Sequence, residues 1–352
     1  KAFDTVPHHL LLNKLVSLGI NDKIVKWVAD YLSDRQQTVV LNGKKSSPVI
    51  VTSGVPQGSV LGPLLFLIFI NSICENIQSH IKLFADDCIV YRIIENGVDS
   101  SVLQNDLNVL EDWCDRWEMS LNISKCKQMC FSRSTSSPTE YKLKNVILDR
   151  VENYKYLGVH LSSSLKWNDH VDNTVAKASR MLYFIRRNFK NTSRSVKQTL
   201  YFSFIRPILE YACVIWDPPQ SYLEQKLERV QNQAVRFVTG DYSPYTSCTK
   251  RKNSLGWESL KERRKCLRLK FFHSIYYGLT GMERVLYIFE PPYASARRDH
   301  SKKAEEYRYN TDCFSFSFFV QTIREWNKLG EEIVSITDND HFYDKLQICI
   351  RD

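Results

Sequence analysis

The sequence predicts an α+β protein whose first part mixes short strands with helices and whose remainder is mostly helical. Short apolar runs bounded by Gly, Pro, Asn and Asp mark strands in residues 1–131, while apolar residues at helical spacing dominate 169–212. The composition, with 43% hydrophobic and 25% charged residues, is that of an ordinary globular protein. The 352 residues therefore allow two or three domains, and disordered, collagen-like and coiled-coil classes are excluded.

The first part of the chain alternates apolar segments with turn-forming residues. Gly19 ends the first helix, Asn21 caps the second, and Asn42-Gly43 favours a hairpin turn. The predicted elements are helices over 8–19 and 21–32, a β-hairpin over 37–52, a buried helix over 63–71, strands over 81–84 and 88–93, and an amphipathic helix over 100–119.

The second part follows a polar, breaker-rich stretch at 132–139 (S-R-S-T-S-S-P-T), which is typical of a linker. We place this linker over 132–150, an extended segment over 151–161, and helices over 169–189 and 194–212. The predicted domains are therefore 1–131, 151–240 and 241–352.

Charge is distributed unevenly along the chain, whose net charge is +9. Net charges are −2 over 1–131, +8 over 132–240, +7 over 241–310 and −4 over 311–352. A near-neutral module followed by basic segments suits a cation site beside a surface for a polyanion, of which nucleic acid is the natural example. The alternative is that Lys and Arg only solvate helix faces.

Several classes of protein are not supported by the sequence. The longest apolar run, Leu61 to Ile70, is half of what a membrane span needs, so no membrane partner is expected. The ten cysteines are scattered, which indicates reduced intracellular thiols. No P-loop, dinucleotide fingerprint or Ser/His/Asp pattern is present. Because the chain starts with Lys1 and shows no signal sequence, we expect it to be part of something longer.

The segment Phe84-Ala85-Asp86-Asp87 places two adjacent carboxylates on a turn between apolar strands. Adjacent carboxylates repel each other, and a hard divalent cation such as Mg²⁺ relieves that repulsion. Two such ions could hold the attacking and leaving oxygens of a phosphoryl transfer. A solvated hairpin turn is the alternative interpretation.

Six segments, in order along the chain, resemble one family. They are Lys1–His8 (K-A-F-D-T-V-P-H), Ser53–Pro63 (S-G-V-P-Q-G-S-V-L-G-P), Phe84–Asp87 (F-A-D-D), Leu121–Lys127 (L-N-I-S-K-C-K), Tyr156–Val159 (Y-L-G-V) and Ser317–Asn327 (S-F-F-V-Q-T-I-R-E-W-N). The series resembles the reverse transcriptase of non-LTR retrotransposons of the jockey/CR1 type (LINE elements).

The resemblance implies a fold and an activity. Residues 1–131 would form a right-hand polymerase palm, an antiparallel sheet with helices, that lacks its first strand and fingers. A primer-grip hairpin and helical thumb would follow over 151–240, and a basic helical region over 241–352. The implied activity is RNA-directed DNA synthesis, in which two Mg²⁺ (or Mn²⁺) ions assist nucleotidyl transfer from a dNTP to a DNA primer on an RNA template. The primer would be nicked chromosomal target DNA, which implies a nuclear location.

The resemblance also assigns site residues. The catalytic and metal-binding set is Asp86, which holds the ions, Asp87, which completes that site, and Lys125, which protonates the departing pyrophosphate. The nucleotide-binding set is Phe3, beneath the incoming sugar, with Gly54, Gln57 and Gly58 against the nascent base pair. The primer grip is Tyr156, Leu157 and Gly158. Simpler roles stay open for these residues: a core aromatic, turn-forming glycines, a solvated lysine and an edge strand.

One departure from the family concerns the first catalytic aspartate, which the pattern places three residues before Lys1. Asp4 stands in the wrong register and is better explained as a turn or capping residue. We therefore expect this chain to be inactive alone. The alternative is a non-catalytic nucleic-acid-binding remnant of such an element. A group II intron maturase-like protein shares the palm, but the segment 317–327 argues against it.

The basic half suggests nucleic-acid contacts through phosphates and through base stacking. The predicted contact residues are Arg186, Arg187, Lys190, Arg194 and Lys197, interleaved with Tyr183, Phe184, Phe189, Tyr201 and Phe202. We expect at least two thirds of these aromatics to be core. A second cluster, at 250–252 and 261–270, would either hold RNA or target DNA or form a solvated basic face.

Overall fold

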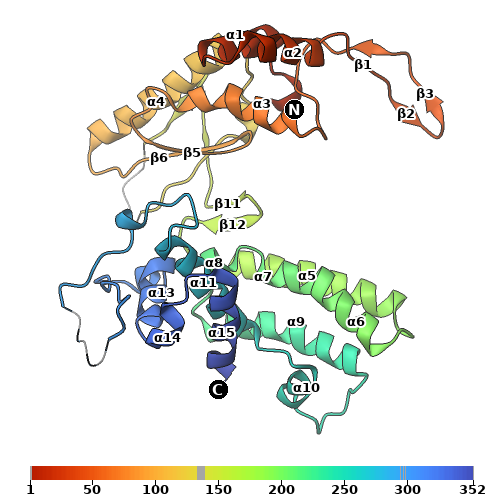
Figure 1. The fold of residues 1–352 in the computed structure, drawn as a ribbon, viewed down its shortest axis with the longest axis vertical. Helices are drawn as coiled ribbons and strands as arrows, with labels where there is room; N and C mark the ends of the chain where they lie inside the picture. Colours follow the sequence, from red (N-terminus) through yellow and green to blue (C-terminus); the bar gives the residue numbers. More distant parts are fainter. Residues whose placement is uncertain (1, 133–138, 294, 296, 298, 352) are drawn as a thin grey trace. The chain divides into compact units, whose positions relative to one another are not determined.

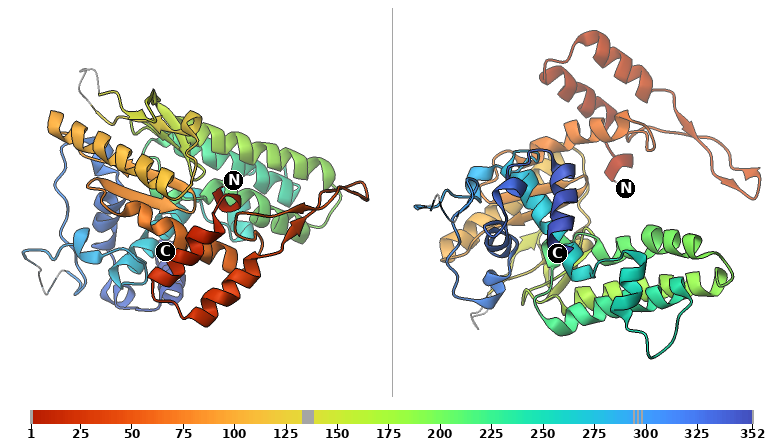
Figure 2. Two further views of the ribbon diagram at one scale, coloured as in Figure 1. Left: turned by 90° about the horizontal axis from the view of Figure 1, so that it is seen from above. Right: turned by 60° about the horizontal axis from the view of Figure 1, so that its bottom comes forward.

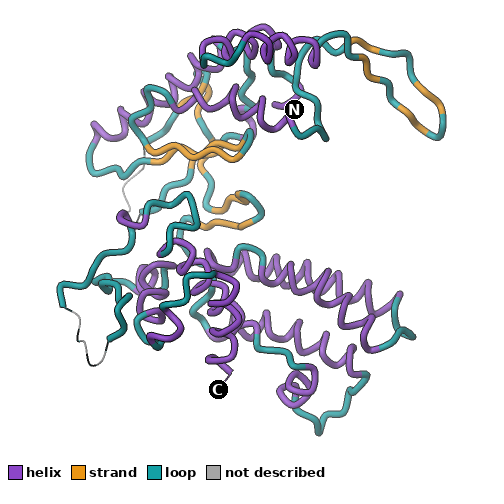
Figure 3. Tube along the Cα trace, viewed as in Figure 1, coloured by secondary structure: helices purple, strands orange, loops and turns teal. Residues whose placement is uncertain are grey.

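The structure, a computed structural model, describes residues 2–132, 139–293, 295, 297 and 299–351, and it divides into two compact units, Lys1–Val151 and Glu152–Asp352 (Figure 1). Helices make up most of the second unit, whereas the first combines helices with short strands (Figure 3). Among the described residues each strand pairs with one other strand. The mixed α+β class predicted from the sequence is confirmed. No helix in the described ranges is both long enough and apolar enough to cross a membrane.

Four helices build the core of the first unit. They are α1 (His8–Ser17), α2 (Asp22–Leu32), α3 (Leu61–Ile70) and α4 (Gly97–Arg116), and a short 3₁₀ turn, Asn71–Cys74, follows α3. Leu11, Phe66, Phe69 and Trp113 meet in this core. The predicted cap is present, because the Asn21 side chain accepts a hydrogen bond from the Lys23 amide at 2.9 Å.

A two-stranded arm over residues 35–51 extends away from α1 and α2 (Figure 2). Strand β1 (Gln36–Gln37) pairs with β4 (Val49–Ile50), and β2 (Val40–Leu41) pairs with β3 (Lys44–Lys45). Asn42 and Gly43 both have positive φ, as a two-residue turn requires. The predicted hairpin is confirmed, with its pairing interrupted between the two ladders.

The hairpin of β5 (His80–Phe84) and β6 (Asp87–Tyr91) is fixed at its entrance by a buried carboxylate. Asp106 of α4 is fully buried and accepts the amides of Gln78 and Ser79 at 3.0 and 2.8 Å. Two otherwise unpaired backbone donors are thereby satisfied just before the strand begins. The strand that was predicted to run to residue 93 ends at Tyr91.

The predicted linker over 132–150 is only partly described, because 133–138 lie outside the described residues. The remainder is structured and belongs to the first unit. Strand β8 (Lys142–Leu143) pairs with β9 (Val146–Ile147), and β10 (Asp149–Arg150) pairs in parallel with β7 (Lys127–Gln128). The apolar side chains of this segment explain the difference, since Tyr141, Leu143 and Leu148 are buried.

The second unit begins with the hairpin of β11 (Asn153–Tyr156) and β12 (Val159–Ser162), as predicted. A helical layer follows, in which α5 (Asn168–Asn188) packs beside α9 (Ser221–Thr239). The helix predicted over 194–212 is divided into α6 (Arg194–Leu200), a π-helical turn (Tyr201–Ile205) and α7 (Arg206–Glu210). Pro207 explains the interruption, because it has no N–H to donate to the preceding turn.

Helix α11 (Leu260–Tyr276) is the centre of the remaining fold and is buried on nearly every side. The other helices of this part are α8 (Cys213–Trp216), α10 (Cys248–Leu255), α12 (Asp312–Ser315), α13 (Phe318–Trp326), α14 (Glu331–Val334) and α15 (Asn339–Arg351). Because α11 packs against α8 and α9 as well as α13 and α15, the predicted boundary at residue 240 does not divide two units.

His170 of α5 links hairpin β11–β12 to the helices of the second unit. Its buried Nδ1 accepts the amide of His160 at 3.1 Å, and its ring lies 4.6 Å from that of Trp216. Burial, reinforced by nearby His160, lowers the pKa of His170 to about 4. The imidazole is therefore neutral in the folded chain at pH 7, as its acceptor role requires.

We expect stability to fall as the pH drops from about 6.5 to about 4, because the unfolded chain then binds a proton at His170 that the folded chain excludes. The loss is at most about 3 kcal/mol. Denaturant unfolding at pH 7 and pH 5 measures it. His170→Asn, which keeps an acceptor but cannot titrate, should flatten this dependence. His160→Asn is the matched control, and an equal flattening by both variants would contradict the assignment.

Candidate functional site

Asp86 and Asp87 lie at the tip of hairpin β5–β6. Phe84 pairs with Asp87, so the turn consists of Ala85 and Asp86 alone. The three-residue turn predicted from the sequence is therefore one residue too long, since Asp87 already belongs to β6. Ala85 has a φ of +51°, in the left-handed region that non-glycine residues rarely adopt. Both carboxylates are exposed and have no hydrogen bond or ion pair with the described residues.

The residue after Asp87 in β6 is a cysteine, Cys88. The pKa of Cys88 is raised to about 12 by burial and, further, by the neighbouring thiols of Cys74, Cys114 and Cys126. Lys125 ends the 3₁₀ turn Ile123–Lys125 immediately before Cys126 and is exposed.

The segment around Phe3 is bound to the Gly/Pro/Gln loop by backbone hydrogen bonds. The Val55 amide donates to the Phe3 carbonyl and the Gly54 amide to the Val6 carbonyl, both at 2.8 Å. The Phe3 ring stacks on Phe66, with centroids 4.1 Å apart. The structure thus joins Phe3 to the loop of Gly54, two of the predicted nucleotide-binding elements, and gives Phe3 a place at the edge of the core.

The backbone conformation at position 54 and the nearby backbone of Asp4 both require a glycine there. Its φ is +89°, and a Cβ there would lie 2.6 Å from the Cα of Asp4. Gly58, with a φ of +81°, has open space around it and is explained by its turn conformation. Gln57 donates its side-chain amide to Asp4 Oδ1 at 2.8 Å. Asp4 does not cap α1, whose N-cap residue is Pro7.

The carboxylates suit a hard divalent cation, since Mg²⁺ is commonly held by one or two carboxylates together with substrate phosphates. Asp86 and Asp87 are the residues that would hold it. Within the described ranges no three His, Cys, Asp or Glu side chains gather as a metal-binding group. The Asp4 carboxylate already accepts a hydrogen bond from the side-chain amide of Gln57.

The turn Leu157–Gly158 joins β11 to β12, with Tyr156 and Val159 as the closing pair. Leu157 has a φ of +44° and Gly158 of +86°. The predicted primer-grip residues therefore occupy the tip of a two-residue hairpin in which a leucine takes a left-handed conformation.

The predicted nucleic-acid-binding side chains differ in their surroundings. Arg187 and Lys190 are exposed and have no partner among the described residues. Arg186 lies 5.9 Å from the rings of Tyr183 and Tyr242, Arg194 donates to the Ser254 carbonyl, and Lys197 lies over Phe237. Of the five interleaved aromatics, Phe189, Tyr201 and Phe202 belong to or pack on the core, slightly fewer than predicted. Tyr183 and Phe184 are exposed.

The second basic cluster, at 250–252 and 261–270, is largely neutralised within the second unit. Arg264 and Arg268 are 1% and 2% exposed and bind Asp217, and Arg268 also binds Glu325. The other pairs are Arg251–Asp241, Lys252–Glu228, Lys261–Glu224, Arg263–Glu210, Arg263–Glu258 and Lys270–Asp340. Neither predicted alternative, a polyanion site or a solvated face, describes this cluster, because it packs the helices around α11.

The segment Ser317–Asn327 has a structural explanation. Trp326 is fully buried and donates its indole N–H to the Lys302 carbonyl at 2.8 Å. The Asn327 side chain bonds both the amide and the carbonyl of Ala304. Together with the Glu325–Arg268 pair, these contacts tie α13 to the extended segment before it and to α11.

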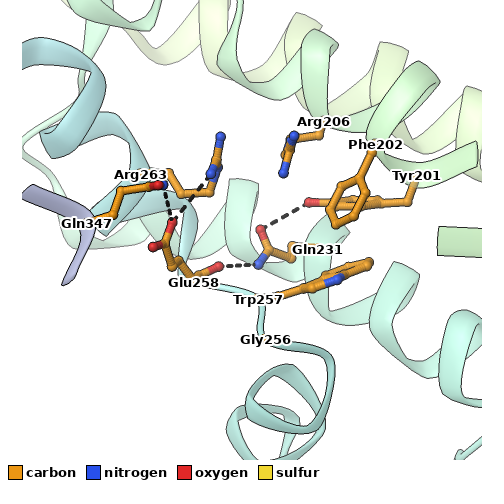
Figure 4. Close-up of a pocket in the computed structure, with 9 residues that line it drawn as sticks. All are labelled: Tyr201, Phe202, Arg206, Gln231, Gly256, Trp257, Glu258, Arg263 and Gln347. Atoms are coloured by element: carbon orange, nitrogen blue, oxygen red, sulfur yellow. Dashed lines mark hydrogen bonds and ion pairs between the residues drawn. The ribbon is translucent and has the colours of Figure 1, made fainter. Parts of the chain in front are cut away.

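A cavity of about 130 Å³ in the second unit lies beside the π-helical turn (Figure 4). Its polar groups bind one another: Tyr201 donates to Gln231, Gln231 to the Glu258 carbonyl, and Arg263 and Gln347 to the Glu258 carboxylate. The aromatic faces are likewise paired, Tyr201 with Trp257 at 4.1 Å and Phe202 with Arg206. This arrangement is that of a hydrogen-bonded core.

Sequence reasoning missed two buried charged residues in the core of the first unit. Asp106 falls on the apolar face of α4, and a carboxylate at a core position was the available signal. Lys14 is buried, donates to the Phe69 carbonyl and the Ser72 hydroxyl, and lies 4.5 Å from the ring of Trp117. Burial lowers its pKa. No sequence pattern distinguished Lys14 from an exposed lysine.

Comparison with known proteins gives a family for the first part of the chain. The family described as "Reverse transcriptase (RNA-dependent DNA polymerase)" matches residues 1–161. The first-unit site, with its Asp86-Asp87 hairpin and its Gly54 loop, lies inside that match. Residues 1–161 therefore match a reverse transcriptase domain.

Its homologues are polymerases of non-LTR retrotransposons. The probable RNA-directed DNA polymerase from transposon BS of Drosophila melanogaster is 30% identical over 295 residues, 78% of this chain and 32% of that protein. The RNA-directed DNA polymerase from mobile element jockey of the same fly is 28% identical over 253 residues, 68% of this chain and 27% of the relative. A probable polymerase from its transposon X-element is 27% identical over 249 residues. The chain thus spans about a third or less of these relatives' length.

We expect Gly54→Ala to destabilise the first unit more than Gly19→Ala. Both glycines have positive φ, which costs an added side chain about 1–2 kcal/mol. Gly19 has open space, whereas at Gly54 the Cβ collides with the Asp4 backbone, adding about 1–3 kcal/mol. Denaturant midpoints of the two variants give the comparison. Equal midpoints would contradict the close approach of Gly54 to Asp4.

Proposed function

We propose that the chain is the polymerase part of a retrotransposon reverse transcriptase, which copies an RNA template into DNA from a DNA primer. The observation that carries the proposal is the two-residue turn that exposes the carboxylates of Asp86 and Asp87, which pair with no described residue, inside the segment that matches the family. Exposed, adjacent carboxylates at a strained turn serve no evident packing purpose, and strained backbone persists where the surrounding structure holds it.

The chemistry proposed for this site is nucleotidyl transfer. When bound, divalent cations neutralise charge on the dNTP phosphates and on the attacking primer 3′-hydroxyl. Asp86 and Asp87 supply the oxygen ligands. Phe3, held by Phe66 and by the Val55 amide, lies beneath the incoming sugar, and Lys125 supplies a proton to the departing pyrophosphate.

The rest of the chain would align the template and primer. In this proposal the first unit is the palm, hairpin β11–β12 holds the primer end, and α5, α6 and α9 form the thumb. Helix α5 carries a suitable stripe, because Lys177, Arg180, Tyr183, Phe184 and Arg187 are exposed at helical spacing. Cationic groups could neutralise phosphates and the aromatic rings could stack on bases or pack in a groove.

The resemblance places a further metal-binding aspartate three residues before Lys1, outside the 352 residues. Asp4 is a poor substitute because its carboxylate accepts the Gln57 amide. We therefore propose that the 352-residue chain binds template and primer but extends the primer at or near background. The second candidate function, a non-catalytic nucleic-acid-binding remnant, would share the binding.

A metal-binding measurement separates these two functions. We expect the chain, mixed with an RNA–DNA template–primer and a dNTP, to take up Mn²⁺ in electron paramagnetic resonance titrations, and Asp86→Asn and Asp87→Asn to reduce that uptake. The affinity of each variant for the RNA–DNA template–primer should stay within about twofold of that of the unmodified chain, because neither carboxylate contacts phosphate directly. Unchanged Mn²⁺ uptake in both variants would favour the remnant, and robust Mg²⁺-dependent extension by the chain would contradict the proposed inactivity.

The α5 stripe makes a separate prediction. Arg180→Ser with Arg187→Ser should weaken hybrid binding and reduce the slope of log affinity against log salt by about 2, since each cation neutralises roughly one phosphate. Fluorescence anisotropy between 50 and 200 mM salt, about the range over which this effect is large, measures both. Lys226→Ser with Lys261→Ser is the control, because these lysines already pair with Asp172 and Glu224. Equal losses in both double variants would exclude α5 as the contact surface.

A further inference from the structure

The turn Leu157–Gly158 is held from one side by Tyr211, which follows α7. The Tyr211 hydroxyl donates to the Leu157 carbonyl at 2.9 Å. A Cβ on Gly158 would lie 2.9 Å from Cε1 of the same ring. The ring therefore covers the turn closely enough to leave room only for glycine at that position.

Tyr211 is in turn fixed by its own neighbours. Its carbonyl accepts the indole N–H of Trp216 at 2.7 Å, and Ala212, the next residue, has a φ of +52°. Trp216 is fully buried and lies beside His170, which accepts the His160 amide of strand β12. Two points of the hairpin, its turn and its second strand, are thus attached to the surroundings of one buried indole.

Core packing does not account for the position of the tyrosine. Tyr211 is 56% exposed, so burying its ring contributes little, yet it joins two left-handed segments that would each be strained in isolation. Left-handed leucine and alanine persist where surrounding contacts determine them, and such places are frequently functional. A hydrogen bond from an exposed hydroxyl to a turn carbonyl fixes geometry more than it adds stability.

We propose that Tyr211 is a positioning residue that holds the Leu157–Gly158 turn in the conformation that receives the primer 3′ end. The inference rests on the proposed function, in which this hairpin contacts the primer. Tyr211 acts through the turn and need not touch the primer itself. Trp216 and His170 hold Tyr211 and the hairpin in fixed positions relative to each other.

Photocrosslinking with the 352-residue chain tests this assignment. The probe is an RNA–DNA hybrid whose recessed DNA primer ends in a 3′-terminal 4-thiothymidine, and crosslinks are mapped by mass spectrometry. In the unmodified chain we expect crosslinks within 153–162. Tyr211→Leu should lower the yield there by about three- to tenfold, the equivalent of one lost hydrogen bond, while total hybrid affinity stays within about twofold. Tyr211→Phe, which keeps the ring but also loses the hydrogen bond, should lower the yield to a similar extent.

Two further variants distinguish positioning from general destabilisation. Gly158→Ala should reproduce the crosslinking loss, because its Cβ meets the Tyr211 ring, and combining it with Tyr211→Leu should add little. Tyr222→Phe, which alters another exposed tyrosine that hydrogen-bonds Asn168, is the matched control and should leave the yield unchanged. Circular dichroism melting confirms that each variant is folded.

The outcomes separate this inference from the proposed function. Crosslinking within 153–162 that survives in folded Tyr211→Leu overturns the positioning role and leaves the proposed function intact. Hybrid binding without any crosslink in 153–162 of the unmodified chain overturns the primer role of the hairpin, and the inference with it. A parallel fall of total affinity and crosslinking in Tyr211→Leu also overturns positioning, because a specific effect on the turn spares the rest of the binding surface.

Discussion

The two-residue turn at Ala85–Asp86 is the constraint on which the proposed site depends. Because β5 and β6 pair up to Phe84 and Asp87, no spare residue is available to relax the backbone, and Ala85 must adopt a positive φ. That conformation costs about 1–2 kcal/mol, which the packing of the hairpin on the first-unit core offsets. Asp106 fixes where the strand begins, so the length of β5 determines where the two carboxylates emerge. Small changes in pairing register would move both acids together.

Charge in the second unit is distributed differently from what the sequence suggests. The densest basic segment, around α11, is used to hold helices together: Asp217 binds Arg264 and Arg268, and Glu325 extends the network to α13. Removing one partner from such a buried group leaves an uncompensated charge, so the network specifies which helices pack together. In the proposed function, the attraction for a polyanion comes instead from groups such as Arg180 and Arg187 on α5, which have no ion pair among the described residues.

Local patterns predicted the elements well and long-range contacts poorly. Asn21, Asn42-Gly43 and the strand pairs at 81–91 and 153–162 were evident because capping and turn chemistry act over a few residues. The π-helical turn was not predicted, because Pro207 lies within an apolar pattern typical of a helix. The structured segment 139–150 was not predicted either, because the burial of Tyr141 depends on its contact with α4. The carboxylate pair was found by its motif. Its support Asp106, the buried Lys14 and the contact of Tyr211 with Gly158 depend on residues distant in sequence, which one chain without its fold does not reveal.

The arm over 35–51 has a consequence for how the protein behaves in solution. A short ribbon with two bare edges offers unpaired amides and carbonyls that another copy can extend, and Leu41 at its end is 72% exposed. Lys44 and Lys45 place two positive charges beside the tip, and their mutual repulsion between copies opposes such stacking. Concentrated salt screens that repulsion and also weakens binding to polyanions. The ionic conditions that weaken the proposed binding to nucleic acid are therefore those in which repulsion between the arms of two copies is weakest.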